Sequence, residues 1–456
     1  MWTAFETKTH ELPFPLMGYP IVPIWAILVL AILAASACSR PPLRWHAAYV
    51  GEGYAETQVN TVIFRKNALI SQAGTQYIAY YDSSGTVILG KRRLGQDDWT
   101  LQKTPFRGNV QDAHNSISLM ADGDGYLHMA WDHHGDPLRY ARSKAPGSLE
   151  LELLPAMVGT HEQRVTYPEF YRLPGGDLLF LYRDGSSGNG NLVLNRYLKT
   201  EQRWIRLHDN LIDGEGQRNA YWQCAIGPDG TLHLAWVWRE TGDVATNHDM
   251  AYARSSDFGA TWTDVDGTPY FLPIKEHTAR YAMRIPQGSN LINQTSLAAD
   301  VQGRPYIATY FKRPLDDCTQ FFLIYRSGRE WRHSTIGARS LDFTLGGYGT
   351  RSPPISRPVV LVEPDRRKPS IHVLYRDEEH GNRVCLSSAR GGEDPDWQHR
   401  HLTAYGMDRW EPVYDTGLWE SDSELHIFLQ RVGQGSGERP VPMLPTPIFV
   451  LEISTR

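Results

Sequence analysis

A strand-like pattern recurs seven times along the chain, and it restricts the fold more than any other feature. In most copies a turn rich in Gly or Asp leads into an alternating aromatic run that stops at charged or polar residues. One aromatic marker per copy gives gaps of 51, 51, 54, 74, 65 and 53 residues between Tyr80, Trp131, Tyr182, Trp236, Tyr310, Tyr375 and Phe428. Periods of this length suit one four-stranded sheet per copy. We therefore predict an all-β fold, a seven-bladed β-propeller with four-stranded antiparallel blades.

The longer gaps before Tyr310 and Tyr375 indicate insertions, which include residues 274–293 and 341–358. The second insertion is rich in Gly, Ser and Pro, as loops are. The segment 57–70 has strand character but belongs to no copy of the pattern. Because ring closure would remove exposed strand edges, we expect this N-terminal segment to join the last blade.

The composition fits this fold and narrows the range of partners. The 456 residues include 14 Trp, 23 Tyr, 40 Gly and 29 Pro, which favours short aromatic strands and tight turns over long helices. Closed all-β architectures often exceed the usual domain size, so we expect residues 43–456 to form one domain behind a separate segment, 1–42. The formal net charge of -5 argues against binding nucleic acid through a basic surface.

The first 42 residues resemble an export signal. The run 21–35 is apolar and is followed by Ala35-Ser36-Ala37-Cys38. A small-residue cleavage site directly before a cysteine is typical of bacterial lipoproteins, so we predict lipidation at Cys38. A single membrane anchor is the alternative, although about 15 apolar residues fall short of the ~20 that span a bilayer. In both cases we expect an exported protein, either secreted or periplasmic, or held at the bacterial cell surface or outer membrane by its N-terminal lipid alone.

The stretch 111–140 concentrates side chains that can move protons and bind anions. His114 and Asn115 precede one strand-like run, and a second run ends on His133 and His134. Adjacent side chains on an extended chain point to opposite faces, so at most one of the last two histidines should face a ligand, and we expect His133 to be structural. Repeat-related histidines inside the aromatic runs are expected to be blade residues without a catalytic role: His128, His233, His372 and His426.

The next two copies add phenols and a guanidinium. Tyr167 lies in RVTYPEFYR and precedes a proline, which favours an extended backbone at this residue. Arg183 lies in LYRDGSSGNGN, and Tyr221 in GQRNAYWQ. The Tyr-Arg-Asp triplet around Arg183 recurs at 375–377. An alternative role for this arginine is therefore a structural salt bridge that recurs from one repeat to the next. Tyr221, among other aromatic residues, has packing as its alternative role.

These residue types suit a particular reaction. The sequence has no well-placed carboxylate pair for a glycosidase, no G-x-S-x-G and no H-E-x-x-H. Imidazole, phenol, guanidinium and amide groups fit β-elimination at a uronic acid. An Arg, His or Asn neutralises the carboxylate, one His or Tyr takes the C5 proton, and a second protonates the leaving oxygen at C4. A tyrosine base would need its pKa lowered by nearby cations.

The motifs HNSISL and DGDGYLHMAWDHHGDPLRYARS, with the pair YPEF and LYRDGSSGNGN, resemble the BNR-repeat family that contains the seven-bladed ulvan lyases, polysaccharide lyase families twenty-four and twenty-five. The resemblance is specific in roughly the first three blades and continues by repeat pattern to the C-terminus. It implies an enzyme that cleaves a sulfated rhamnose and uronic-acid polysaccharide by β-elimination and leaves a 4,5-unsaturated uronate. It further implies roles for individual residues: His114 and Tyr167 as the proton-transfer pair, Arg183 as the carboxylate neutraliser, and His134 and Tyr221 as substrate contacts. In the mechanism we expect, His134 or Asn115 assists Arg183 in binding the carboxylate.

The same resemblance implies that a structural zinc or calcium ion can be bound, although the chemistry needs no cofactor. His248, Cys224 and Cys318 are loose candidates for ligands. The widely spaced Cys224, Cys318 and Cys385 form neither a disulfide framework nor a C-x-x-C site. The expected partner is an acidic sulfated polysaccharide, and we expect a monomer.

Two other functions stay open. Ser255-x-Asp257-x-Gly259-x-Thr261-Trp262 matches the Asp-box turn of sialidase-like propellers, which raises a glycoside hydrolase as one alternative. The box is a structural hairpin found in unrelated propellers, so it indicates fold and says little about function. The second alternative is a surface lipoprotein that binds glycans without turning them over.

Overall fold

The structure is a computed structural model that describes residues 44–64, 67–363, 368–391 and 395–454. The predicted signal and Cys38 therefore lie outside the described residues. Chain contacts separate residues 1–44 from a compact unit, Trp45–Arg456. Among the described residues, no helix is both long enough and apolar enough to cross a membrane.

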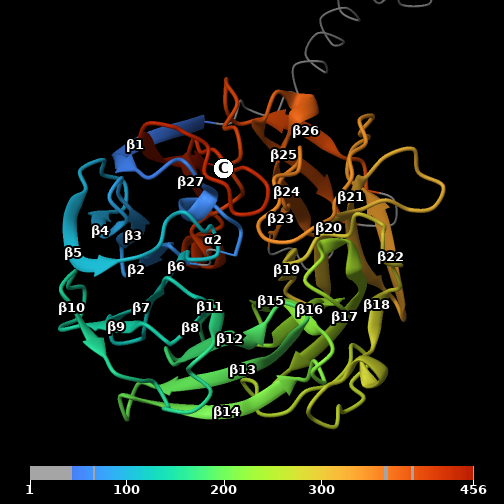
Figure 1. Ribbon diagram of the computed structural model, residues 1–456, viewed down its shortest axis with the longest axis horizontal. Coiled ribbons are helices and arrows are strands. Elements are labelled where there is room, and N and C mark those ends of the chain that lie inside the picture. Colours follow the sequence, from blue (N-terminus) through green and yellow to red (C-terminus); the bar gives the residue numbers. More distant parts are fainter. Residues whose placement is uncertain (1–43, 65–66, 364–367, 392–394, 455–456) are drawn as a thin grey trace, which may run out of the picture. The chain divides into compact units, whose positions relative to one another are not determined.

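Seven antiparallel sheets follow one another around a ring, as the sequence predicted (Figure 1). The first three blades share a simple order in which the first strand along the chain lies nearest the centre. Blade 1 contains β2 (Leu69–Gln72), β3 (Thr75–Tyr81), β4 (Thr86–Arg93) and β5 (Thr100–Arg107). Blade 2 contains β6 (Ile117–Ala121), β7 (Leu127–Trp131), β9 (Tyr140–Ser143) and β10 (Leu151–Leu154). Blade 3 contains β11 (Val165–Arg172), β12 (Leu178–Ser186), β13 (Asn189–Leu198) and β14 (Arg203–Ile212), with the short β8 (His134–Asp136) added beside β11.

The next three blades repeat this order. Blade 4 contains β15 (Asn219–Ile226), β16 (Leu232–Arg239), β17 (Asn247–Ser255) and β18 (Tyr281–Met283). Blade 5 contains β19 (Ser296–Ala299), β20 (Pro305–Phe311), β21 (Gln320–Ser327) and β22 (Glu330–Thr335). Blade 6 contains β23 (Val359–Val362), β24 (Ser370–Asp377), β25 (Arg383–Arg390) and β26 (Gln398–His401). The described helices are short: η1 (Gln58–Asn60), η2 (Val244–Thr246), η3 (Glu276–Thr278), η4 (Glu378–His380) and α2 (Thr416–Asp422).

The last blade joins the two ends of the described chain. Its sheet has the order β1 (Arg44–Gly53), β28 (Thr446–Ser454) and β27 (Leu425–Gln430). On the inner side, Val413 and Asp415 exchange backbone hydrogen bonds with β27 and take the place of a fourth strand. An N-terminal strand thus closes the ring, which confirms the expected mode of closure.

The prediction of which residues close the ring was wrong. The closing strand is Arg44–Gly53, whereas the segment 57–70 contains the turn of η1 and the start of β2. Thr57 caps η1 and donates to the backbone oxygen of Val110, and Asn60 bonds to the backbone of Tyr54 and Tyr81. These buried polar side chains give the backbone local partners, which favour a turn over a strand.

The aromatic runs of the sequence pattern are the second strands of the blades. All eight residues of β16 and all five of β7 are buried, because both faces of a blade pack against its neighbours. The repeat-related histidines lie inside the blades, as expected. His128 and His233 each place Nδ1 2.6 Å from a tyrosine hydroxyl on the third strand of their own blade.

Candidate active site

The six site residues named from the sequence meet at one end of the ring, where β6, β11 and β15 begin and β7 and β12 end. Between ring centroids, His114 lies 3.9 Å from His134 and 5.7 Å from Tyr167, and Tyr167 lies 5.8 Å from Tyr221. The guanidinium carbon of Arg183 is 5.1 Å from the centre of the Tyr167 ring. Residues from three blades therefore form one cluster.

Asp112 organises the two imidazoles and was not singled out from the sequence. Its two carboxylate oxygens lie 2.7 Å from His114 Nδ1 and 2.6 Å from His134 Nδ1. An ionised carboxylate only accepts hydrogen bonds, so both Nδ1 atoms are donors and each Nε2 is left for a ligand. The rings stack with an angle of 13° between their planes. The D-x-H spacing was the available signal, because the backbone N–H of His114 also donates to Asp112.

This arrangement makes His114 an imidazolium near neutral pH. Burial lowers the pKa of His114, but the carboxylates of Asp112 and Glu438 outweigh burial and raise it to about 9. Burial and the charge of His114 lower the pKa of His134, so that the second ring is the neutral one. Burial acts to raise the pKa of Asp112, but both histidines hold it well below its usual range.

Two loops from the far side of the ring complete the surroundings of His114. Thr350 Oγ1 lies 3.4 Å and Glu438 Oε1 lies 3.3 Å from its Nδ1. The ring of Phe64 stacks at 5.3 Å between centroids. These residues are distant from His114 in sequence and carry no local motif, so sequence analysis had no means of finding them.

Tyr167 has a backbone conformation opposite to the expected one. Its φ is +56°, in the left-handed region, and the pairing of β11 with β12 shifts between Thr166 and Glu169. Pro168 cannot donate to a ladder, and a bulge at this point accommodates it. A left-handed backbone conformation costs a non-glycine residue of order 1–3 kcal/mol in conformational free energy. Residues with this conformation occur most often at functional sites. The prediction of an extended Tyr167 was therefore wrong, and the bulge places its buried ring among the site residues.

Arg183 is buried and lacks the partners that its repeat equivalent has. Arg376 bonds to the backbone oxygens of Trp410 and Pro354 and to the Asn382 side chain. Arg183, 2% exposed, donates only to Thr166 Oγ1, and among the described residues its Nε and Nη1 have no partner.

The alternative role for Arg183, a salt bridge that recurs from one repeat to the next, is wrong, because no ion pair of Arg183 is found among the described residues. The adjacent Asp184 pairs with His161 and Arg164 instead. A buried guanidinium with two unused donors is prepared to bind an anion.

Of the two phenols in the site, Tyr221 is the one that accepts a hydrogen bond from an arginine. Arg239, another residue missed from the sequence, donates to its hydroxyl at 2.9 Å, and Ser187 lies at the same distance. Burial raises the pKa of Tyr221, but Arg239 and Arg183 overcome it and lower the pKa to about 7. Burial and the neighbouring Tyr221 raise the pKa of Tyr167 instead. The two phenols titrate as a pair in which Tyr221 ionises first.

Asn115 and His133 occupy the edges of the cluster. One amide hydrogen of Asn115 bonds to the backbone oxygen of Asn109, and its Oδ1 has no partner among the described residues. The unused polar atom of Asn115 is therefore its buried side-chain oxygen, a hydrogen-bond acceptor. His133 is fully buried, and its Nε2 accepts from the backbone N–H of Arg139, which confirms its structural place.

Asp112, His114 and His134 are the one group of convergent metal-ligating side chains within the described residues. One carboxylate and two imidazoles are donors that zinc accepts. Ligand atoms on a tetrahedral zinc, however, lie about 3.3 Å apart, and here each Nδ1 lies 2.6 or 2.7 Å from its carboxylate oxygen. The triad is therefore hydrogen-bonded and does not fit a metal in this arrangement. Across the described ranges, no such group contains the other candidates, His248, Cys224 and Cys318.

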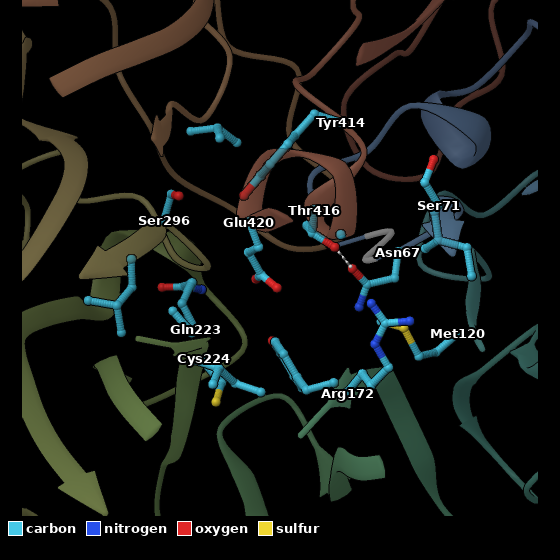
Figure 2. Close-up of a pocket in the computed structure, with 17 residues that line it drawn as sticks. Asn67, Ser71, Met120, Arg172, Gln223, Cys224, Ser296, Tyr414, Thr416 and Glu420 are labelled. Atoms are coloured by element: carbon cyan, nitrogen blue, oxygen red, sulfur yellow. Dashed lines mark hydrogen bonds between the residues drawn. The ribbon is translucent and has the colours of Figure 1, made fainter. Parts of the chain in front are cut away.

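A separate pocket lies at the opposite ends of the innermost strands (Figure 2). Its volume is about 90 Å³, and α2 covers it with Thr416 and Glu420. Thr416 Oγ1 donates to Asn67 across the pocket. Arg172, at the end of β11, faces Glu420 without forming an ion pair in the described structure. The protein around Glu420 withdraws water from this exposed residue's carboxyl and raises its pKa to about 7, against the effect of Arg172. This pocket contains none of the clustered histidines or tyrosines.

Comparisons with known proteins agree with the fold. The short isoform of ulvan lyase from Alteromonas sp. (strain LOR) is 26% identical over 232 residues, which cover 38% of this chain and 43% of the relative. The chain thus spans less than half the length of that curated relative. The crystal structure of the polysaccharide lyase Uly1 superposes with a TM-score of 0.67 at 15% identity and covers 90% of this chain and 99% of that one.

A PL25 ulvan lyase bound to -[GlcA(1-4)Rha3S]- gives a TM-score of 0.62 at 14% identity, with 90% of this chain and 95% of that one covered. At such identities the structural matches establish the fold alone. Residues 75–339 match the model of a family described as BNR repeat-containing, and this match covers more than half of the chain. The chain therefore belongs to the BNR repeat-containing family.

Proposed function

We propose that this protein is a polysaccharide lyase that cleaves an acidic, sulfated, uronate-containing glycan by β-elimination. The observation that supports this most is the buried Arg183, whose Nε and Nη1 have no partner among the described residues, beside two phenols and an imidazolium. The names of the relatives, two ulvan lyases and a polysaccharide lyase, support the same class of reaction.

In the proposed reaction, Arg183 binds the uronate carboxylate. Neutralising that charge makes the C5 proton acidic enough to be removed, because the negative charge that develops next to the carboxylate is stabilised by the guanidinium. Burial strengthens this interaction, since little water competes for the donors. Asn115 and the neutral His134 contact hydroxyl groups of the same sugar.

The base role belongs to the Tyr167–Tyr221 pair, which holds one negative charge near neutral pH because Arg239 and Arg183 stabilise it. The phenolate takes the C5 proton, and the electron pair forms the C4–C5 double bond. The C4–O bond then breaks, and the imidazolium of His114 gives its proton to the leaving oxygen. A base and an acid whose pKa values are separated in this direction are both in their active protonation states between about pH 7 and 9.

The test is incubation with ulvan and with other uronate glycans, followed by ultraviolet absorbance of the 4,5-unsaturated uronate and by reducing-end assay. The proposal expects both signals to rise together. New reducing ends without the absorbance would indicate a hydrolase, and glycan binding without either signal would indicate a binding protein. Full activity in both His114→Ala and Tyr167→Phe would refute the roles given to these residues.

The proposal extends to the cell. We propose an exported, monomeric lipoprotein anchored through Cys38, with the acidic polysaccharide as its partner. Support comes from the small-residue and cysteine sequence that follows the apolar run. Mass spectrometry of the protein purified from its native membrane would detect a lipid on Cys38, and an intact N-terminus would contradict the proposal.

A further inference from the structure

The loop between β22 and β23 brings an exposed aromatic ring to the rim of the candidate active site. Thr350 in this loop contacts His114, and Tyr348 lies two residues before it. Two residues of chain span at most about 7 Å, so Tyr348 lies close to the imidazole pair. The side chain is 66% exposed, although it is large and largely apolar.

The same ring also adjoins the tyrosine half of the site. It packs so closely on Gly242 that a Cβ added there would lie 2.7 Å from two ring carbons. The loop 240–242 in turn packs against Gly188, where an added Cβ would lie 2.9 Å from Thr241. Gly188 follows Ser187, whose hydroxyl bonds to that of Tyr221. Tyr348 thus packs on a loop that reaches the base half of the site, and its own loop reaches His114.

Hydrogen bonds fix the backbone on both sides of Tyr348, and its ring packs on Gly242. The N–H of Gly347 donates to Asp243 at 2.7 Å, and its carbonyl accepts from Val244 at 3.0 Å. After the ring, the carbonyl of Thr350 accepts from Gly437 at 2.8 Å. A fixed aromatic side chain loses little conformational entropy when a ligand stacks on it.

A cation lies next to the backbone of Tyr348. Arg351 donates from Nη1 to the backbone oxygen of Tyr348 at 3.3 Å, and its guanidinium lies against Gly347. It is half-buried and makes no ion pair with a described carboxylate. Guanidinium groups bind sulfate and carboxylate groups with paired hydrogen bonds.

We propose that Tyr348 and Arg351 form a subsite for a sugar next to the reacting uronate, with Tyr348 stacking on the sugar ring and Arg351 binding a sulfate or carboxylate on it. The subsite rests on the proposed glycan-cleaving function and adds an anionic sugar as the class of ligand outside the reacting position. It makes no contact with the reacting atoms, so it acts on binding.

The decisive variants are Tyr348→Ala, Tyr348→Phe and Arg351→Gln, with Trp45→Ala as the control. Trp45 is 65% exposed on the outermost strand of blade 7, so it matches Tyr348 in exposure but lies far from the site. Tyr348→Ala should raise KM for ulvan about two- to tenfold, the range that one stacked aromatic ring contributes, and leave kcat within about twofold. Tyr348→Phe should keep the wild-type KM, and Arg351→Gln should raise KM mainly at low salt. An unchanged KM in Tyr348→Ala, or a loss as large in Trp45→Ala, would overturn the subsite.

Binding measured without turnover separates this inference from the proposed reaction. Calorimetric titration of Tyr167→Phe with ulvan fragments gives a Kd that does not depend on cleavage. Adding Tyr348→Ala should weaken that Kd about two- to tenfold by the same stacking contribution. An equal Kd would refute the subsite even if the wild-type protein is a lyase, and a weakened Kd would support it even if the protein proves to be a binding protein.

Discussion

Replacing Asp112 by Asn should move the upper limit of the pH–activity profile downward. Asp112 is the largest of the influences that raise the pKa of His114, and burial acts against it. Without this carboxylate only Glu438 opposes burial, and the pKa of His114 should fall from about 9 towards its ordinary 6.5. The proposed acid would then lose its proton within the working range of the enzyme.

The size of the effect follows from these two values. With a pKa of about 9, roughly nine-tenths of His114 is protonated at about pH 8, and with 6.5 only about 3% is. We therefore expect kcat/KM of Asp112→Asn to fall by up to about 30-fold at pH 8 but less than about twofold at pH 6. A shift of this size corresponds to about 3 kcal/mol of differential interaction, at about 1.4 kcal/mol per unit of pKa.

The assay is the initial rate of unsaturated-uronate formation from ulvan between about pH 5 and 10, for which kcat/KM reports groups of the free enzyme. The control is Asp97→Asn, which removes the carboxylate of an exposed pair, His46–Asp97, with the same 2.7 Å contact distance. The control should leave the profile unchanged. An alkaline limit that stays in place in Asp112→Asn, in a protein that melts normally, would refute the acid role of His114.

Three further predictions concern single side chains. Arg183→Lys should lower kcat/KM by about 10²-fold or more, because an ammonium cannot reproduce the two unused donors, and a matched Arg164→Lys change on the exposed surface should have little effect. Tyr221→Phe should abolish the acid limb of kcat/KM near pH 7, and a limb that persists would place the ionisation elsewhere. Glu420→Gln should raise the melting temperature above pH 7 and leave it nearly unchanged below about pH 4.5. The wild-type carboxyl has a raised folded-state pKa, so its ionisation destabilises the fold as pH rises, and equal melting curves at both pH values would contradict this.

The fold was predictable because each blade repeats one local pattern. The second strands, such as β16, are buried over their whole length and therefore consist mainly of apolar and aromatic residues. Such runs are visible in the sequence. The closing strand was misplaced because its neighbour in space, β28, lies at the other end of the chain. Strand character alone did not separate residues 44–53 from 57–70, where Thr57 and Asn60 turn the backbone.

The site was predictable to the extent that its residues lie in recognisable motifs. His114, Tyr167 and Arg183 do so, and the structure brings them together. Arg239 and Glu438 do not, because they become site residues only through blades packed around a common centre. The roles also depend on this packing. From sequence, Tyr167 was the tyrosine expected to need a nearby cation, whereas the pKa that the arginines lower is that of Tyr221.

Ring closure by the first described strand has a consequence for when activity can arise. Glu438, which helps to keep His114 protonated, lies between β27 and β28, and β28 pairs with β1. During synthesis β1 therefore has no pairing strand until β28, near the end of the chain, has emerged from the ribosome. His114, the proposed proton donor, therefore gains this second carboxylate only in the finished ring. A chain cut short within the last blade would hold every histidine and tyrosine of the site but would lack Glu438, one of the two carboxylates that raise the pKa of His114.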